Sequence, residues 1–409
     1  MNRREFLLQA GAALVALGGP GRSSATGDEA LAQERPSRGG AALVTLFLGG
    51  DVMTGRGIDQ VLSRPGDPIL NEPHVKDARR YVDLAEKVNG PIPRPVDNAY
   101  IWGDALEELA RAASDVRIVN LETAVTTSND FSKRKGIHYR MNPANVPCLA
   151  AGRIDCCALA NNHVLDWGAA GLAETLERLR RAGIGTAGAG PSHREAESPA
   201  VIEVSGKGRV LVFSFGSEDS GIPRDWAARA DRPGVNFLPD FSARTTRRIA
   251  AMILNAKRKG DIVVASIHWG DNWGFQVRRE HVTFARGLVD AAGVDVVHGH
   301  SSHHPKGIEV YRGKPILYGC GDLINDYEGI GGRAEFRPDL GLLYFVSLDA
   351  ASGTLSRLRM VPVRRRRFRL DRGSEEEARW LTETLNRQSA PFGTRVERDR
   401  EGRLSLRLI

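Results

Sequence analysis

The chain has 409 residues, 41% hydrophobic and 26% charged, which is enough to bury the core of one large domain or two ordinary ones. Its formal net charge of +7 is modest, and no Lys/Arg stripe with interleaved aromatic residues runs through it, which argues against nucleic acid as a partner. The four cysteines, at 148, 156, 157 and 320, have the spacing of neither a zinc ribbon nor a disulfide framework, so we expect structural thiols.

The N-terminus predicts an export signal. The stretch "RREFLL" starts at Arg3 and leads into a weakly apolar run, and "ALAQ" offers a small-x-small cleavage site after Ala32. This is the pattern of a twin-arginine (Tat) signal, and it fits better than a short buried helix with a chance arginine pair. The run is too short and too mild for a stable transmembrane anchor. We expect residues 1–32 to be the signal and residues 33–41 a flexible leader, and we expect a periplasmic or other extracytoplasmic protein.

Beyond the leader, apolar runs alternate with amphipathic stretches. Strands are predicted at seven apolar runs: 42–49, 116–122, 154–160, 210–216, 262–268, 294–299 and 314–321. Helices are predicted at four amphipathic stretches: 102–114, 169–182, 243–259 and 279–292. Gly183, Gly260 and Gly293 stand where helix C-caps belong. This rhythm predicts an α/β fold with a largely parallel sheet.

The remaining segments depart from this rhythm. Residues 57–103 are proline-rich and are interpreted as an insertion or a loop around the site, and residues 190–213 as a strand pair. Residues 355–370 alternate apolar and basic residues as an edge strand would, with Arg364–Arg367 interpreted as a solvated face rather than an anion site. "SEEE" predicts the capped start of a helix over 374–386. We expect one domain over 42–350 and a strand–helix extension over 351–409 packed on it.

Polar clusters follow the predicted strands. "GGDVM", "NLE" and "ANNHVLDWG" follow the first three, and "HWGDNW", "HGHSSHH" and "GCGD" follow the last three. In open α/β sheets the ligand crevice forms at strand C-termini, so we expect one shared site. Its side chains suit divalent cations, two of which, about 3.5–4 Å apart, can clamp a tetrahedral anion. These metal-competent residues are Asp51, Glu122, Asn162, His163, His268, His300 and His303.

The ordered motifs "GDVM", "NLE", "NNHVLDWG", "HWG" and "GHSSHHPKGIEVYRGKPILYGCGDLIND" resemble the CapA/PgsA family over residues 43–345. That family is associated with poly-γ-glutamate capsule biosynthesis, and its domain resembles the calcineurin-like metallophosphatases. The resemblance implies a layered sandwich, with central β-sheets flanked by helices and a metal site at the strand C-terminal ends.

The resemblance also implies two metal positions. Asp51 and His303 would bind the first metal, and Glu122 would stand where metallophosphatases place a bridging aspartate. The ligands of the second metal would be Asn162, His268 and His300.

The resemblance further implies that His163 faces the substrate as a general acid or an oxyanion stabiliser. Asp166, three residues on, would orient it. Arg140, His304 and Asp322 are predicted substrate contacts, His304 being otherwise interpreted as a surface residue. His298 is expected behind the ligands. The other four histidines are interpreted as structural: His74, His138, His193 and His281.

Four departures from the metallophosphatase pattern leave the number of metals open between none and two. Met53 replaces the histidine of "GDxH", and Glu122 is longer than an aspartate. "GHSSH" has one residue more than "GHxH", and Asp322 replaces an asparagine common in the family.

The sequence therefore predicts an exported, metal-dependent hydrolase acting on a phosphoester or an amide of an envelope polymer. Mn or Fe is favoured, with Zn next, because a protein that folds in the cytoplasm loads its metal there. The expected partner is an anionic polymer or a phosphorylated or γ-glutamyl substrate, within a capsule-synthesis complex. The alternative is a non-catalytic export or assembly factor that holds the polymer in the same crevice. A nucleotide phosphodiesterase would need a base-stacking pocket that the sequence does not display.

Overall fold

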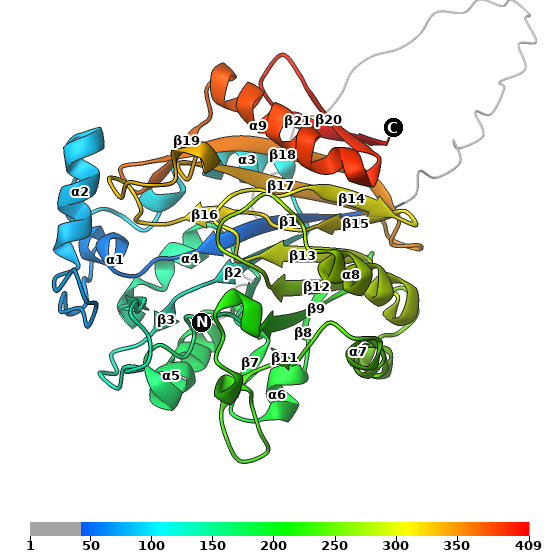
Figure 1. The fold of residues 1–409 in the computed structure, drawn as a ribbon, viewed down its shortest axis with the longest axis horizontal. Helices are drawn as coiled ribbons and strands as arrows, with labels where there is room; N and C mark the ends of the chain where they lie inside the picture. Colours follow the sequence, from blue (N-terminus) through cyan, green and yellow to red (C-terminus); the bar gives the residue numbers. More distant parts are fainter. Residues whose placement is uncertain (1–41, 409) are drawn as a thin grey trace, which may run out of the picture. The chain divides into compact units, whose positions relative to one another are not determined.

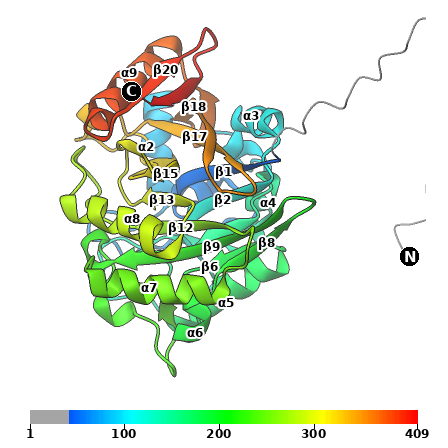
Figure 2. The ribbon, with the colours of Figure 1, turned by 90° about the vertical axis from the view of Figure 1, so that its right-hand side faces the viewer.

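The computed structural model describes residues 42–408, so the predicted signal and leader lie outside the described residues. Two large β-sheets are stacked face to face, with helices on their outer faces (Figures 1 and 2). This confirms the predicted fold class, a layered α/β sandwich of the metallophosphatase type. Of the helices within residues 42–408, none has both the length and the apolar character needed to cross a bilayer.

The larger sheet has ten strands in the order β20-β21-β18-β17-β1-β2-β5-β6, with β16 paired to β1 and β19 to β18. In chain order the strands are β1 (Leu43–Val52), β2 (Val116–Leu121), β5 (Cys156–Ala158), β6 (Gly185–Ala187), β16 (Asp322–Ile324), β17 (Leu340–Asp349), β18 (Leu355–Arg366), β19 (Arg369–Arg372), β20 (Thr394–Arg398) and β21 (Leu404–Leu408). β1 runs parallel to β2 and β16 and antiparallel to β17. The carboxyl ends of β1, β2, β5 and β16 therefore reach one edge.

The second sheet has seven strands in the order β11-β9-β12-β13-β15-β14, with β8 paired to β9. They are β8 (Ala200–Val204), β9 (Gly208–Ser217), β11 (Phe237–Leu238), β12 (Ile262–His268), β13 (Val296–His300), β14 (Ile308–Tyr311) and β15 (Lys314–Leu317). β9, β12, β13 and β15 are parallel, whereas β8 and β14 are antiparallel to their neighbours. Two small pairs stand apart: β3 (Ala124–Val125) with β4 (Arg140–Met141), and β7 (Ala189–Gly190) with β10 (Gly234–Val235).

The α-helices are α1 (Gly57–Val61), α2 (Arg79–Asn89), α3 (Ala105–Ala112), α4 (Pro147–Ala151), α5 (Gly168–Arg181), α6 (His193–Glu197), α7 (Ala243–Ala256), α8 (Arg279–Ala292) and α9 (Glu375–Ser389). Short 3-10 turns occupy Tyr100–Trp102, Pro143–Asn145, Glu218–Ser220, Arg224–Trp226, Ala334–Phe336 and Ala390–Phe392. α9 begins with the predicted capping box, in which Ser374 and Glu377 each bond the other's backbone.

Three apolar layers hold the sandwich together. Successive residues of β1 point into two of these layers in turn. Leu46 and Leu48 face the layer between the sheets, and Phe47 faces the layer under α3, α4 and α5. Cys156 and Cys157 divide between the same two layers, as predicted for opposite faces of a strand. The third layer lies between the seven-stranded sheet and the helices α7 and α8.

All the predicted strands and helices are present, most of them with shifted ends. α8 has the bounds that were predicted, whereas the strand predicted over 154–160 is limited to the three residues of β5. Residues 57–103, interpreted as an insertion or a loop around the site, contain the helices α1 and α2. The segment 355–370 is not an edge either, since β18 lies between β17 and β21. The solvated face predicted for Arg364–Arg367 fails at Arg365, which is 2% exposed and donates to three backbone carbonyls. Those carbonyls need a donor that the irregular backbone around them does not supply.

Candidate metal centre

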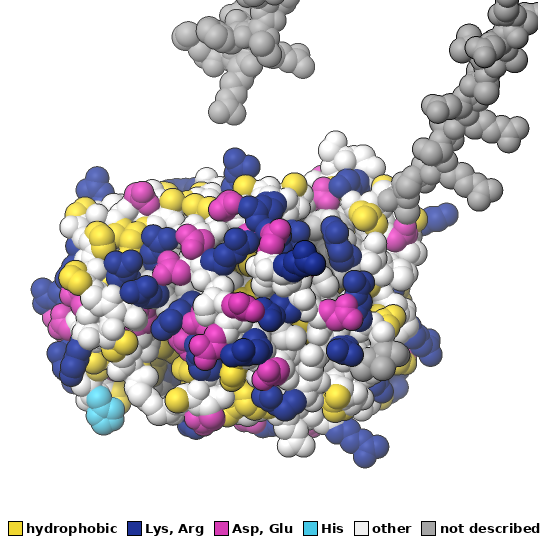
Figure 3. Space-filling model, turned by 90° about the horizontal axis from the view of Figure 1, so that it is seen from above, with side chains coloured by type: hydrophobic (Ala, Val, Ile, Leu, Met, Phe, Trp, Pro, Cys, Tyr) yellow, Lys and Arg dark blue, Asp and Glu magenta, His cyan; other side chains and the backbone are white. Residues whose placement is uncertain are grey.

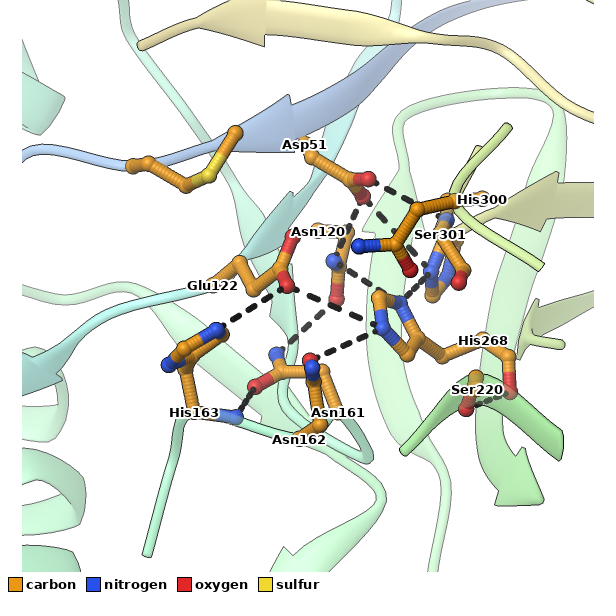
Figure 4. A network of polar contacts seen from close by, with 12 residues as sticks. Asp51, Asn120, Glu122, Asn161, Asn162, His163, Ser220, His268, His300 and Ser301 are labelled. Carbon is orange, nitrogen blue, oxygen red and sulfur yellow. Dashed lines mark hydrogen bonds and ion pairs between the residues drawn. The ribbon is translucent and has the colours of Figure 1, made fainter. Parts of the chain in front are cut away.

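Polar side chains from both large sheets meet beyond the carboxyl ends of the parallel strands (Figure 4). Asp51 lies on β1, with Asn120 of β2 and Asp322 of β16 beside it in the ladder. His268 and His300 end β12 and β13 and pair in register. One sheet therefore supplies most of the carboxylate and amide groups, and the other supplies imidazoles.

The backbone around Asp51 fixes its position. Gly50 passes so close to Gly321 that a Cβ added to Gly50 would lie 1.7 Å from the Gly321 carbonyl oxygen. The N–H of Asp51 donates to that oxygen at 3.0 Å. The Asp51 carboxylate accepts from Asn120 Nδ2 at 2.7 Å and from the backbone N–H of Ser301 at 3.1 Å. Ser301 has a φ of 92°, which is strained for a residue other than glycine and aims its N–H at Asp51.

A chain of hydrogen bonds fixes the tautomer of His300. His298 Nε2 lies 2.9 Å from the carbonyl oxygen of Gly49, which can only accept, so His298 carries its proton on Nε2. His298 Nδ1 therefore accepts from Ser266 Oγ at 3.1 Å, and Ser266 Oγ accepts from His300 Nε2 at 2.9 Å. Burial lowers the pKa of His298 to about 4 and that of His300 well below the usual value. Near pH 7 both rings are neutral, and a lone pair remains on Nδ1 of His300.

His268 has more acceptor neighbours than protons. Its Nδ1 lies 2.9 Å from His300 Nδ1, and its Nε2 lies 3.0 Å from Asn162 Oδ1. Burial lowers the pKa of His268 well below its usual value, so the ring carries a single N–H and can donate in only one of these contacts. With Oδ1 of Asn162 facing the ring, the other contact sets two lone pairs against each other. A cation bound there removes this conflict, and imidazole with amide oxygen is a donor set that divalent metals accept.

Three buried carboxyl groups, those of Asp51, Glu122 and Asp322, lie at the site. Burial and the nearby Asp322 raise the pKa of Asp51 to about 7, and burial, Asp51 and Asp322 raise the pKa of Glu122 well above its usual value. The Oε2 atom of Glu122 is buried without a hydrogen-bond partner among residues 42–408. Burial would raise the pKa of Asp322, but His303, 2.8 Å away, lowers it. Burial thus disfavours the charged forms of Asp51 and Glu122, and a cation bound beside them would stabilise those forms, so the residues fit a bound cation.

Two sets of side chains each bring three ligand atoms within 4.8 Å of one another. The first set is Asp51, His268 and His300, and the second is Asp51, His303 and Asp322. Asp51 belongs to both sets, whereas Glu122 belongs to neither. The Oε1 atom of Glu122 lies 3.8 Å from His268 Nε2, on the side of the site that faces Asn162.

His163 lies across the site from the two sets. Its Nδ1 is 2.6 Å from Asp166 Oδ2, and its Nε2 is 3.7 Å from Glu122 Oε1. The buried Asp166 also accepts from Lys135 Nζ at 2.5 Å and from the Tyr139 backbone at 2.7 Å. Burial lowers the pKa of His163 to about 4, so its proton sits on Nδ1 towards Asp166 and Nε2 is left to accept. Asp166 therefore orients His163, in the arrangement that the sequence predicted.

An open cavity of about 510 Å³ leads to the second set. Its walls include the aromatic rings of Tyr81, Tyr139, Tyr327 and Trp273, with His303 among the lining residues. Beneath it the buried guanidinium of Arg56 lies 3.9 Å from the Tyr81 ring and 4.4 Å from the Tyr139 ring. A larger hollow of about 900 Å³ over α6 and α7 contains none of the residues of the two sets.

Three predicted substrate contacts lie differently from expectation. Arg140 donates to the carbonyl of Ser128 and stacks 4.0 Å over Trp167, away from both sets. His304 is fully buried, with its ring stacked 4.7 Å from Phe336, so its interpretation as a surface residue was wrong. Neighbouring aromatic rings cover it. Asp322 belongs to the second set, a position suited to a cation.

Sequence reasoning missed several residues that the structure places at the site. Asn120 and Asn161 stand inside the quoted motifs "NLE" and "ANNHVLDWG"; Asn161 donates to Asn120 and accepts from the backbone of His163. Their position after a strand was a usable signal. Lys135 contacts His163, Asp166 and the Asn162 carbonyl from a loop, and no sequence pattern indicated it.

Comparison with known proteins gives consistent matches. A family model described as bacterial capsule synthesis protein PGA_cap matches residues 45–327, a range that contains both sets. The chain is 52% identical over 359 residues to a probable polyglutamine synthesis accessory protein of Mycobacterium tuberculosis, covering 88% of this chain and 94% of that protein. It is 32% identical over 264 residues to the PGA biosynthesis protein CapA of Bacillus subtilis, covering 64% of each. It is 24% identical over 283 residues to the capsule biosynthesis protein CapA of Bacillus anthracis, covering 69% of this chain and 60% of that protein.

Proposed function

Because the chain belongs to the bacterial capsule synthesis protein family PGA_cap, we propose that it is an accessory protein of capsule or poly-γ-glutamate synthesis that works as a metal-dependent hydrolase. The family supports the capsule role, and the names of the relatives in Mycobacterium and Bacillus agree with it. The metal dependence is supported by one observation above all: His268 faces two acceptor atoms with a single proton. The hydrolase assignment is supported by the His163–Asp166 pair on the far side of the site.

The chemistry divides between the cation and the chain's own residues. A bound divalent cation supplies Lewis acidity and lowers the pKa of water towards neutrality. Asp51 and the imidazoles at 268, 300 and 303 would hold it, with Mn or Fe favoured and Zn next. His163 Nε2 faces the site and would move a proton at the reacting atoms, while Asp166 keeps the ring in place. The aromatic cavity beside His303 would orient an amide or phosphoester substrate and exclude water from it.

The test combines metal content with turnover. We expect elemental analysis of the purified protein to find a divalent metal, which His268→Ala and His300→Ala lose. Hydrolysis of γ-glutamyl amides and phosphodiesters by His163→Ala should fall roughly 10²- to 10⁴-fold, the usual contribution of a proton-transfer residue. The matched control is His193→Ala, at an exposed histidine at the start of α6, which should retain full turnover and metal. Absence of metal from the wild type, together with equal rates for the wild type and His163→Ala, would overturn the proposal.

A non-catalytic assembly factor is the second candidate, and Met53 favours it. Met53 stands where the metallophosphatase motif has a histidine, and its sulfur lies 3.6 Å from the hydroxyl of Tyr327 instead of offering an imidazole. This candidate predicts polymer binding without turnover, so the same turnover assay separates the two.

Export through the Tat pathway is part of the proposal and rests on the twin-arginine motif of the signal alone. Fractionation of cells that produce the chain with Arg3→Lys and Arg4→Lys should leave the protein in the cytoplasm, whereas the unchanged chain should reach the extracytoplasmic fraction. Equal distribution of the two would contradict export by this route.

A further inference from the structure

The edge of the ten-stranded sheet farthest from β6 carries a group of arginines on one face. α9 packs on the other face, where Leu358 of β18, Val396 of β20 and Leu404 of β21 are buried with the helix residues Leu381 and Leu385 (Figure 2). Side chains alternate along a strand, so the residues between these apolar positions point away from α9. We call this side the arginine face; it comprises Arg357, Arg359, Arg395, Arg403 and Arg407.

The strand register places these arginines side by side. Arg395 of β20 pairs directly with Arg407 of β21, and Arg359 of β18 pairs with Ser405 of β21. Arg357 stands two residues along β18 from Arg359, towards the end of β21 that carries Arg407. Like charges directly opposite each other on a sheet are destabilising, so the arrangement has a cost in the isolated protein.

Acidic residues compensate only part of this charge. Arg407 pairs with Glu397 at 3.1 Å, and Arg403 pairs with Glu401 and lies 3.6 Å from Glu108. Within residues 42–408, no ion pair is formed by Arg357, Arg359 or Arg395. Figure 3 looks onto the side of the molecule that carries α9, where Lys and Arg side chains are mixed with Asp and Glu side chains. The arginine face therefore combines two arginines that have acidic partners with three that have none among residues 42–408.

Arg359 is the most constrained member of the group. It is half-buried, its guanidinium lies 5.3 Å above the ring of Phe345, and its Nε is buried without a hydrogen-bond partner among the described residues. Burial, followed by the charges of Arg357, Arg403 and Arg111, lowers the pKa of Arg359. A nearby anion would stabilise the charged guanidinium of Arg359, because its attraction opposes the repulsion from the neighbouring arginines.

The face favours an extended anion over a small one. Arg357, Arg395 and Arg407 are exposed, and a single ion pair at an exposed site is worth little. A chain that carries many carboxylates can contact several guanidinium groups at once and add these small gains. The face presents Arg, Ser and Glu to solvent, with no exposed aromatic ring on which nucleobases could stack.

The face is remote from the metal centre. β17 links the two: Arg357 of β18 pairs with Ser347, and Ser347 pairs with Thr45 of β1. Asp51 lies six residues further along β1, roughly 20 Å away at the rise of a strand. A chain held on the arginine face therefore does not occupy the metal-binding residues.

We propose that the arginine face is a binding surface for a polycarboxylate chain, separate from the metal centre. It keeps the polymer attached to the protein while another part of the same polymer occupies the crevice. The identity of the ligand rests on the proposed function, whereas the surface itself does not.

The test measures binding of fluorescently labelled poly-γ-glutamate to the purified protein by anisotropy, at several salt concentrations. The triple variant Arg357→Gln/Arg395→Gln/Arg407→Gln should bind about 3- to 100-fold more weakly than the wild type, as expected for the loss of three exposed charge contacts. Its affinity should also depend less steeply on salt. The matched control is Arg244→Gln/Arg247→Gln/Arg279→Gln, which removes three exposed arginines from α7 and α8 and should bind like the wild type.

Equal weakening by both triple variants, or by neither, would overturn the proposal. So would face-dependent binding of single-stranded DNA or phosphatidylglycerol vesicles without binding of the polymer. The exposed His193→Ala variant should bind the polymer as the wild type does. Failure of the hydrolase assignment would appear as unchanged turnover in the His163→Ala variant, and it would leave the result for the arginine face intact.

Discussion

Removal of the Asp326 carboxylate should destabilise the fold more than any exposed charge change. Asp326 is fully buried and accepts from Arg56 Nη2 at 2.5 Å, from Arg56 Nε at 3.2 Å and from the Gly57 backbone at 2.9 Å. Asp326→Ala leaves the Arg56 guanidinium buried between Tyr81 and Tyr139 with only Glu72, 3.3 Å away, as a carboxylate partner.

Breaking a buried ion pair from one side costs about 3–5 kcal/mol. The entropy of unfolding of a domain of about 370 residues is roughly 0.8 kcal/mol per kelvin. Dividing the cost by this entropy gives a fall in Tm of about 4–6 °C. The fall is larger than that expected from lost packing alone, because an aspartate contributes little apolar area.

Differential scanning calorimetry of the wild type and Asp326→Ala at pH 7 measures this shift. Asp77→Ala is the matched control, since Asp77 forms an equally short pair with Arg79 but both side chains are largely exposed. Its Tm should stay close to that of the wild type. A similar Tm for Asp326→Ala and the wild type, or equal falls in the two variants, would refute the argument that burial sets the cost.

Two further predictions concern groups outside the centre. Burial would raise the pKa of Asp219, but hydrogen bonds from His281 and Ser217 lower it to about 2, so its contribution to stability should be complete above pH 4 and vanish as the pH falls through 2. With allowance for partial exposure, the free energy of unfolding in urea should be about 1–2 kcal/mol higher for the wild type than for Asp219→Asn at pH 5. Near pH 2 the two values should be equal, and a difference that stays constant with pH would contradict this. Arg365→Met removes the donor to the carbonyls of Asp322, Pro338 and Leu340, which should lower the free energy of unfolding by about 3 kcal/mol. The control Arg366→Met changes an exposed side chain and should lower it little. Equal melting temperatures for the two variants would show that those carbonyls find other donors.

Strand-end residues were predictable because the position of a strand end follows from local pattern. Asp51, His268 and His300 each close an apolar run, and parallel strands bring such ends to one edge. Lys135 and Arg56 were not predictable, because they reach the site from irregular segments whose course depends on tertiary packing. Arg365 was misjudged for a related reason: basic alternation suggests solvent, and only the structure shows the carbonyls that draw the guanidinium inwards.

The proton chain behind His300 illustrates another limit. His298 was expected behind the ligands and Ser266 carried no signal in the sequence, yet together they decide which nitrogen of His300 carries a hydrogen. Ligand types can be predicted from residue letters, whereas tautomers depend on neighbours that only the folded chain brings into contact.

The placement of β1 bears on how the protein is made. This strand is the first described element, yet two of its three partners, β16 and β17, come from residues 322–349. During synthesis the ribosome must add nearly three hundred residues after β1 before that side of the strand can pair, because closing so long a loop has to wait for its far end. Until then its hydrogen-bonding groups remain open to chaperones or to other nascent chains, so the candidate metal-binding residues assemble only late in translation.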